Sequence, residues 1–142
     1  MGRFVTDPLA CSYAYPKGLG APLTKEFAQS GTIKQPDLGD LINKLELCMK
    51  YEGSVTLEDE VDGSEKSLRV EADKAQYLIT LAEETSNGLV VRGFENEAAE
   101  KRKVAVLGDL WNDRAICRDP SVVISAFEEF LNTGDVSREL LT

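Results

Sequence analysis

The sequence predicts an α+β fold, with a twisted antiparallel sheet of about five or six strands and two helices packed on one of its faces. Two observations carry this prediction. Residues 37–50 and 119–133 place apolar side chains at helical spacing, and the residues between these stretches repeat the alternating pattern of strands. Helices that are separated from a run of strands are typical of α+β proteins. We therefore expect the order helix, antiparallel meander, helix over residues 36–142.

The C-terminal helix has the clearest boundaries. Asp119 is a good N-cap, because its carboxylate can accept hydrogen bonds from the unpaired backbone N–H groups of the first turn, and Pro120 suits the first helical position. Gly134 favours the left-handed conformation that ends a helix. The apolar residues between these boundaries form one stripe, which predicts packing on a flat apolar surface. They are Val123, Phe127, Phe130 and Leu131.

The other helix is predicted over Asp37–Lys50. Pro36 and Asp37 favour a helix start, and Gly53 favours a stop. Its apolar residues recur with a helical period, which indicates a second core-facing helix. They are Leu38, Leu41, Ile42, Leu45, Cys48 and Met49.

The first strands of the sheet follow from alternating apolar and polar residues. Ser54–Asp59 turns Val55 and Leu57 inward, and the next strand alternates in the same way. Gln76–Glu83 carries apolar residues at both parities, which predicts a central strand that is covered on more than one side. The inward residues of the second of these three strands are Leu68, Val70 and Ala72.

The remaining strands complete the meander. Asn87-Gly88 predicts a type I′ hairpin turn, because both residues tolerate the positive φ that this turn requires. Leu89–Phe94 then returns antiparallel to Gln76–Glu83. Lys103–Leu107 is the next predicted strand, and Leu110–Cys117 is the last one before the C-terminal helix.

We expect one domain over residues 1–142, since this length and a hydrophobic content of 42% suit a single core. Residues 1–35 form a less regular N-terminal arm, because prolines and glycines interrupt its short apolar pieces. Phe4-Val5 and Cys11–Tyr15 are candidates for short strands, either at a sheet edge or in an ordered arm that crosses the core. After the last helix, Val136 and Leu140 are the tail residues expected to return to the core.

The cysteines and the hydropathy pattern indicate a cytoplasmic protein. Cys11, Cys48 and Cys117 are odd in number and far apart, which argues against a disulfide framework or a zinc site, so we expect reduced and mostly buried thiols. No run of about 18 apolar residues is present, and the first residues lack the basic start and apolar block of a signal peptide.

The charge balance indicates the kind of partner. Asp and Glu number 25 and Lys and Arg number 16, which gives a formal net charge of −9. Binding to phosphate groups requires a basic surface, so we expect neither nucleic acid nor an anionic membrane as a partner. A basic protein partner suits this charge, because opposite charge speeds and orients the encounter. The alternative is that the acidic surface provides solubility alone.

The sequence lacks the residues of most catalytic sites, and we expect neither enzymatic activity nor a metal or cofactor. It contains no histidine, which excludes Ser-His and Cys-His nucleophiles. Gly18-Leu19-Gly20 lacks the continuation of a phosphate-binding loop. Asp109 and Asp113 remain as a carboxylate pair that could perform acid–base chemistry. The structural alternative is that both are turn and edge residues, with Asp113 paired to Arg114 or Arg118.

An acidic rim is the most specific candidate site. Carboxylates gather around a predicted turn at Gly63 and on a neighbouring turn, and this spacing does not match a calcium-binding loop. An ordinary solvated hairpin tip is the structural alternative. As a binding rim for a basic partner, the residues are Glu58, Asp59, Glu60, Asp62, Glu65, Glu83 and Glu84.

The order of elements and three segments resemble small bacterial immunity proteins that neutralise polymorphic toxins, including those of contact-dependent growth inhibition. The segments are Trp111-Asn112-Asp113-Arg114, Cys117-Arg118-Asp119 and Phe127–Ser137, the last of which has a Phe-x-x-Phe-x-x-Thr-Gly ending. The similarity extends over Asp37–Leu140, and its motif-like part is the last third of the chain.

This resemblance implies stoichiometric binding to a cognate toxin, commonly a nuclease with a basic groove, whose active site the acidic protein would occlude. It implies no particular interface residues, because each immunity protein matches its own toxin. The sequence leaves two alternative functions: a small carboxylate-dependent enzyme and a general protein-interaction module.

Overall fold

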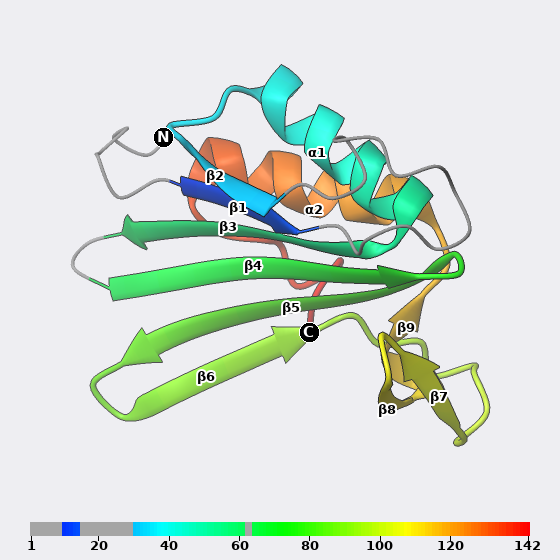
Figure 1. The fold of residues 1–142 in the computed structure, drawn as a ribbon. Helices are drawn as coiled ribbons and strands as arrows, with labels where there is room; N and C mark the ends of the chain where they lie inside the picture. Colours follow the sequence, from blue (N-terminus) through cyan, green and yellow to red (C-terminus); the bar gives the residue numbers. More distant parts are fainter. Residues whose placement is uncertain (1–9, 15–29, 62–63) are drawn as a thin grey trace.

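The computed structural model describes the chain except residues 1–9, 15–29 and 62–63. It forms one large antiparallel sheet with both helices on one face, together with a small separate hairpin (Figure 1). The α+β prediction is therefore confirmed. The elements are β1 (Ala10–Ala14), β2 (Ser30–Lys34), α1 (Leu38–Tyr51), β3 (Gly53–Val61), β4 (Ser64–Asp73), β5 (Gln76–Thr85), β6 (Gly88–Gly93), β7 (Lys103–Val106), β8 (Asp109–Asn112), η1 (Asp113–Ala115), β9 (Ile116–Cys117) and α2 (Pro120–Thr133).

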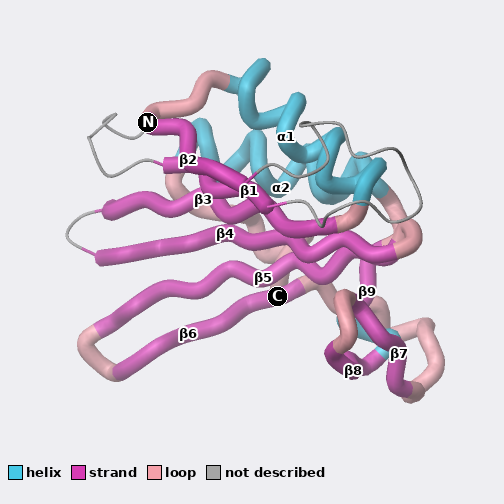
Figure 2. The backbone as a smooth tube through the Cα atoms, in the orientation of Figure 1, coloured by secondary structure: helices cyan, strands magenta, loops and turns pink. Residues whose placement is uncertain are grey.

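The strands of the large sheet lie in the order β2-β1-β3-β4-β5-β6. The short strand β9 also pairs with β5, at Tyr77 and Leu78, so β6 and β9 share one edge of β5 (Figure 2). From β3 to β6 each strand pairs with the next along the chain. Antiparallel strands can be joined in this way by short turns. The predicted meander is therefore present from β3 to β6, whereas β7 and β8, which were expected to continue it, form a separate hairpin.

Both helices begin where their N-caps predict. Asp37 caps α1 in a reciprocal capping box with Asp40, and Asp119 accepts a hydrogen bond from the backbone N–H of Ser121 at the start of α2. Gly134 ends α2 with a φ of 81°. The end of α1 differs slightly from the prediction, because Glu52 rather than Gly53 is its C-cap and adopts a φ of 66°.

The core lies between the two helices and the sheet. Val55 pairs with Val70, and Val70 pairs in turn with Ile79, so one row of inward side chains crosses three strands. From the helix side, the fully buried residues include Leu45 and Phe127. The predicted stripes of both helices and the predicted inward faces of β3 and β4 therefore meet in one core.

A second, smaller cluster lies on the opposite face of the sheet. Leu78, Val106 and Ile116 are buried together, because the β7–β8 hairpin packs over the beginning of β5. Gln76 Nε2 donates a hydrogen bond to the carbonyl oxygen of Ala105 and helps to hold the hairpin there. The prediction that Gln76–Glu83 is covered on more than one side is confirmed for this part of β5.

The prediction of one continuous strand over Leu110–Cys117 is wrong. The chain forms β8, then the 3₁₀ turn η1, and then β9. Asn112 caps the turn by accepting a hydrogen bond from the backbone N–H of Arg114, and Asp113 is held by two arginines from other segments. Alternation along the sequence cannot reveal these contacts, because one of the arginines lies in the loop before β7.

Two hairpin turns also differ from the expectation. The β5–β6 hairpin is present, but Thr85 pairs with Gly88, and among the turn residues only Gly88 has a positive φ, of 109°. The residues that adopt two successive positive φ values are Lys74 and Ala75, between β4 and β5, at 52° and 59°. A type I′ turn prefers Asn and Gly at such positions, so the residue types Lys and Ala do not predict this turn.

The described parts of the N-terminal arm, β1 and β2, join the large sheet, and the tail contributes to its core. β1 lies between β2 and β3 rather than at the edge, and β2 forms the edge; Phe4-Val5 lies outside the described residues. In the tail, Val136 is buried as predicted, and Leu141 is more buried than Leu140.

Candidate functional site

We call the sheet face opposite α1 and α2 the open face. Where the β7–β8 hairpin does not cover it, this face carries mostly polar side chains. The pairing register shows which residues lie on this face, because every second residue of a strand points to the same side. Across the middle of this face Thr56 pairs with Arg69, and Arg69 pairs with Thr80. Arg69 also forms a salt bridge of 3.2 Å with Glu71. The positive charge at the centre of the open face therefore has an acidic partner.

A hollow of about 290 Å³ lies toward the β5–β6 hairpin end of the open face. Glu58, Ser67 and Ala82 occupy one register row across β3, β4 and β5, and Glu84 pairs with Leu89 in the neighbouring hairpin. Its lining combines carboxylates with one apolar edge residue and one lysine: Glu58, Asp59, Glu65, Lys66, Ser67, Ala82, Glu84 and Leu89.

The structure brings together part of the predicted acidic rim. Glu58, Glu65 and Glu84 are all exposed and all line the hollow. Asp59 also borders the hollow, but it is only 4% exposed and pairs with Lys66, so by strand alternation its side chain belongs to the helix face. The turn residue Asp62 and the side chain of Glu60 lie outside the described residues. We call Glu58, Glu65 and Glu84 the acidic triad.

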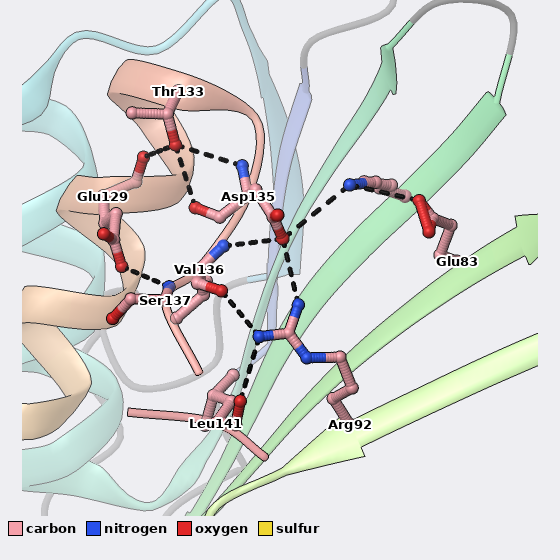
Figure 3. A network of polar contacts seen from close by, with 9 residues as sticks. Glu83, Arg92, Glu129, Thr133, Asp135, Val136, Ser137 and Leu141 are labelled. Atoms are coloured by element: carbon pink, nitrogen blue, oxygen red, sulfur yellow. Dashed lines mark hydrogen bonds and ion pairs between the residues drawn. The ribbon is translucent and has the colours of Figure 1, made fainter. Parts of the chain in front are cut away.

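Glu83 does not belong to the acidic triad, because it points to the helix face of the sheet. Its carboxylate forms a salt bridge of 3.1 Å with Lys66, whose ammonium also lies 3.7 Å from Asp135 (Figure 3). Asp135 follows the C-cap of α2, so this chain of charges joins β4 and β5 to the end of the helix. Glu83 therefore has a structural partner within the protein.

Arg92 completes this polar network. Its Nη1 lies 3.1 Å from Asp135, and its Nη2 donates hydrogen bonds to the carbonyl oxygens of Val136, at 2.7 Å, and Leu141, at 2.9 Å (Figure 3). Burial would raise the pKa of Asp135, but a backbone N–H from Val136 and the charges of Lys66 and Arg92 outweigh this and lower it. The network fastens the C-terminal tail to the sheet.

Asp113 is engaged by two arginines. Arg118 Nη2 lies 2.6 Å from its Oδ1, and Arg102 Nε lies 3.1 Å from its Oδ2. The hydrogen bond from Arg118, with smaller contributions from Arg102, holds the pKa of Asp113 below its usual value despite burial of the group. Asp109 is exposed at the start of β8. This geometry agrees with the structural alternative for the Asp109 and Asp113 pair, in which Asp113 pairs with Arg118.

The two cysteines with described side chains are buried, free thiols. Burial raises the pKa of Cys48 to about 12, and burial likewise raises the pKa of Cys117. A nucleophilic cysteine needs its thiolate, so both groups have the properties of core residues. Within the described ranges, no group of three or more Cys, Asp or Glu side chains is arranged to hold a metal ion.

The site also contains residues that sequence reasoning missed. Leu89 and Val91 of β6 are 63% and 56% exposed, and Leu89 borders the hollow. The sequence predicted this strand, but it carried no signal that β6 would be the last strand of the sheet.

Neither helix in the described part of the chain has the length and apolar character needed to cross a membrane.

Comparison with known proteins identifies the family and a similar fold. Residues 20–140 match the DUF6911 family, which is described as a family of unknown function. A crystal structure of a hypothetical protein from Neisseria gonorrhoeae has a similar fold, with a TM-score of 0.67, 15% sequence identity, and coverage of 91% of this chain and 90% of that one. No curated protein matches the chain. Because the family match spans most of its length, the chain belongs to the DUF6911 family of unknown function.

Proposed function

We propose that this protein is a bacterial immunity protein of the contact-dependent growth inhibition type, which acts in the cytoplasm by binding a cognate basic toxin and occluding its active site. The observation that carries the proposal is the acidic triad around the hollow on the open face. A surface of this kind suits lysine and arginine side chains, such as those that line the nucleic-acid groove of a nuclease. The toxin, on this proposal, meets carboxylates where its substrate would present phosphates.

The grouping of three exposed carboxylates around the hollow supports binding through the open face. Glu58, Glu65 and Glu84 are exposed, whereas Glu83 and Asp113 are held by basic groups of the protein. Exposed carboxylates on one face raise the encounter rate with a basic partner and orient its approach. The exposed Leu89 at the border of the hollow adds an apolar contact, which pairing of charges alone does not provide.

A non-catalytic function fits the remaining groups. The chain has no histidine, the pKa values of the thiols of Cys48 and Cys117 are raised, and both carboxylate oxygens of Asp113 contact guanidinium groups. None of these groups is prepared for proton transfer or nucleophilic attack near neutral pH. These properties support a protein that acts by binding another molecule rather than by converting it chemically.

The test is co-expression of the protein with the toxin domain encoded beside it in the genome. We expect a stoichiometric complex, inhibition of the toxin, and an affinity that falls with added salt. Replacing the acidic triad together, as Glu58→Lys, Glu65→Lys and Glu84→Lys, should weaken binding by roughly tenfold or more, since each rim charge then repels the partner. The single replacement Glu84→Lys has a matched control in Glu128→Lys, because both change the charge by the same amount and Glu128 is exposed on α2, on the other side of the sheet.

Three results would contradict the proposal. A neighbouring toxin that retains full activity in the presence of this protein would remove the immunity function. Equal loss of affinity in Glu84→Lys and in Glu128→Lys would show that net charge matters and that the open face does not. Comparable binding to many unrelated basic proteins would indicate a general interaction module instead.

A further inference from the structure

The outer edge of β6 is an exposed apolar strand edge. Leu89, Val90 and Val91 are consecutive and are 63%, 46% and 56% exposed. β6 is the last strand of the sheet order, and Figure 1 shows it as the outermost strand, beside β5. Single exposed apolar residues are ordinary, but three in a row on a strand edge form a surface suited to another strand.

The backbone groups of this edge point away from the sheet. Gly93 exchanges both of its backbone hydrogen bonds with Thr142, at 3.3 and 3.1 Å, so its N–H and C=O face outward from β5. Because β6 pairs with β5 in regular register, every second residue shares this orientation. The N–H and C=O groups of Leu89 and Val91 therefore face outward as well. Among the described residues, no backbone partner is present for these two.

The edge lacks the features that usually prevent strand addition. Such features are prolines, outward lysines and bulges, and Gly88–Gly93 contains neither proline nor lysine and pairs without a bulge. Its one charged residue, Arg92, is turned toward the C-terminal tail and is largely buried. In the described part of the chain, Thr142 of the tail pairs with Gly93, and no backbone hydrogen bond from the tail reaches Leu89 or Val91.

The surroundings of the edge determine which strand it suits. Glu84 lies directly across from Leu89 on the open face, and Glu58 and Glu65 lie beyond it around the hollow. An added strand would run about 10 Å from β5, since neighbouring strands lie about 4.8 Å apart. A lysine or arginine of that strand can cover Leu89 with its aliphatic stem and bring its charge to Glu84. Alternate basic residues therefore complement this face.

We propose that the β6 edge binds an extended segment of the toxin, which adds a strand to the sheet and directs basic side chains over Leu89 and Val91 toward the acidic triad. Backbone hydrogen bonds to Leu89 and Val91 supply affinity, and the carboxylates supply selection for basic residues. This inference rests on the proposed function, because it names the binding mode of the same basic partner.

The experiment uses the full chain and a soluble synthetic peptide of alternating lysine and valine as the probe. Binding is measured by calorimetry, and amide hydrogen exchange is measured residue by residue. We expect exchange at the amides of Leu89 and Val91 to slow by about tenfold or more with peptide present, because these N–H groups gain acceptors.

The decisive pair of variants is Val91→Pro and Val91→Thr. Proline removes the outward N–H, while the hydrogen bonds to β5 pass through Val90 and Arg92, so the sheet should remain intact. We expect Val91→Pro to lose at least about tenfold in affinity, and Val91→Thr, which keeps the N–H, to stay within about threefold. Leu89→Pro is a second test at an equivalent position, and an unchanged amide exchange pattern in β5 shows that either variant is folded.

Three outcomes would overturn the inference. They are equal binding by Val91→Pro and Val91→Thr, slowed exchange elsewhere but not at Leu89 and Val91, and absence of peptide binding. A free protein that is dimeric, and that becomes monomeric in Val91→Pro, would assign the edge to a second copy of the chain. Failure of the proposed function is separate: the peptide would protect the edge while the neighbouring toxin remained unbound.

Discussion

Arg92 illustrates at the residue scale how one side chain can determine the position of a whole segment. Its guanidinium contacts Asp135 and the carbonyl oxygens of Val136 and Leu141, so three points of the C-terminal tail depend on it. Its Nε is buried without a hydrogen-bond partner. The orientation that lets both Nη groups bond to the tail therefore leaves the Nε donor unpaired.

Replacing Arg92 should therefore release the tail. We expect Arg92→Ala to lower the free energy of unfolding by about 2 kcal/mol, because buried carbonyl acceptors lose a charged donor. Arg92→Lys is the control: it keeps the charge but cannot reproduce the planar fork, so it should be intermediate. Urea denaturation measures both, and equal stability of Arg92→Ala and the unmodified protein would contradict the assigned role.

Asp135 should contribute a pH-dependent part of the stability. Its pKa is lower in the folded protein than the ordinary value of 3.8, so the folded state favours its ionised form. This contribution is fully present above pH 3.8 and is lost as the pH falls through the lowered pKa. Asp135→Asn should be less stable than the unmodified protein near pH 6, and the difference should shrink as the pH is lowered through this range. Thermal unfolding across pH measures it, and a constant difference would contradict the linkage.

The turn between β4 and β5 holds unfavourable backbone conformations. Lys74 and Ala75 both have positive φ, which costs energy for residues with a Cβ. We expect the double replacement Lys74→Asn with Ala75→Gly to raise the free energy of unfolding by about 1–2 kcal/mol. The same pair placed at Ser86 and Asn87, which lack positive φ, is the control and should not stabilise the protein. Denaturant midpoints at constant m-value measure the effect.

At the scale of elements, local signals determined the helices, and distant contacts determined the last strands. The ends of α2 are set by interactions within a few residues, at Asp119, Pro120 and Gly134. Its boundaries could therefore be predicted from the sequence. The break between β8 and β9 depends on Asp113 meeting Arg102 and Arg118, and no local pattern encodes the contact with Arg102.

The apolar stripe of α2 is the feature that attaches this helix to the sheet. Phe127 is fully buried in the core, so Phe127→Ala should lower the free energy of unfolding by about 3–5 kcal/mol through lost burial and a residual cavity. The neighbouring exposed Glu128→Ala should change it by less than about 0.5 kcal/mol. Chemical denaturation distinguishes the two, and similar effects would show that the stripe does not carry the packing.

At the scale of the whole molecule, the net charge of −9 and the position of the acidic triad concern association rather than folding. Long-range attraction acts on the encounter and is screened by salt. We therefore expect the association rate with the proposed basic partner to fall by roughly tenfold between about 50 mM and 500 mM salt, while the dissociation rate changes much less. Stopped-flow kinetics measures both rates, and a salt effect confined to dissociation would contradict steering.

By itself, the sequence determined the α+β class, both helices with the start of α1 and both ends of α2, the inward faces of β3 and β4, and the acidic character of the surface. These features depend on periodicity, capping and composition, which act between near neighbours or on the chain as a whole. Only the tertiary structure decided that Glu83 is paired with Lys66 while Glu84 faces the hollow, and that β6 ends the sheet with Leu89 and Val91 exposed. Strand order and register depend on pairing between residues far apart in the chain, and a shift of one residue moves a side chain to the opposite face.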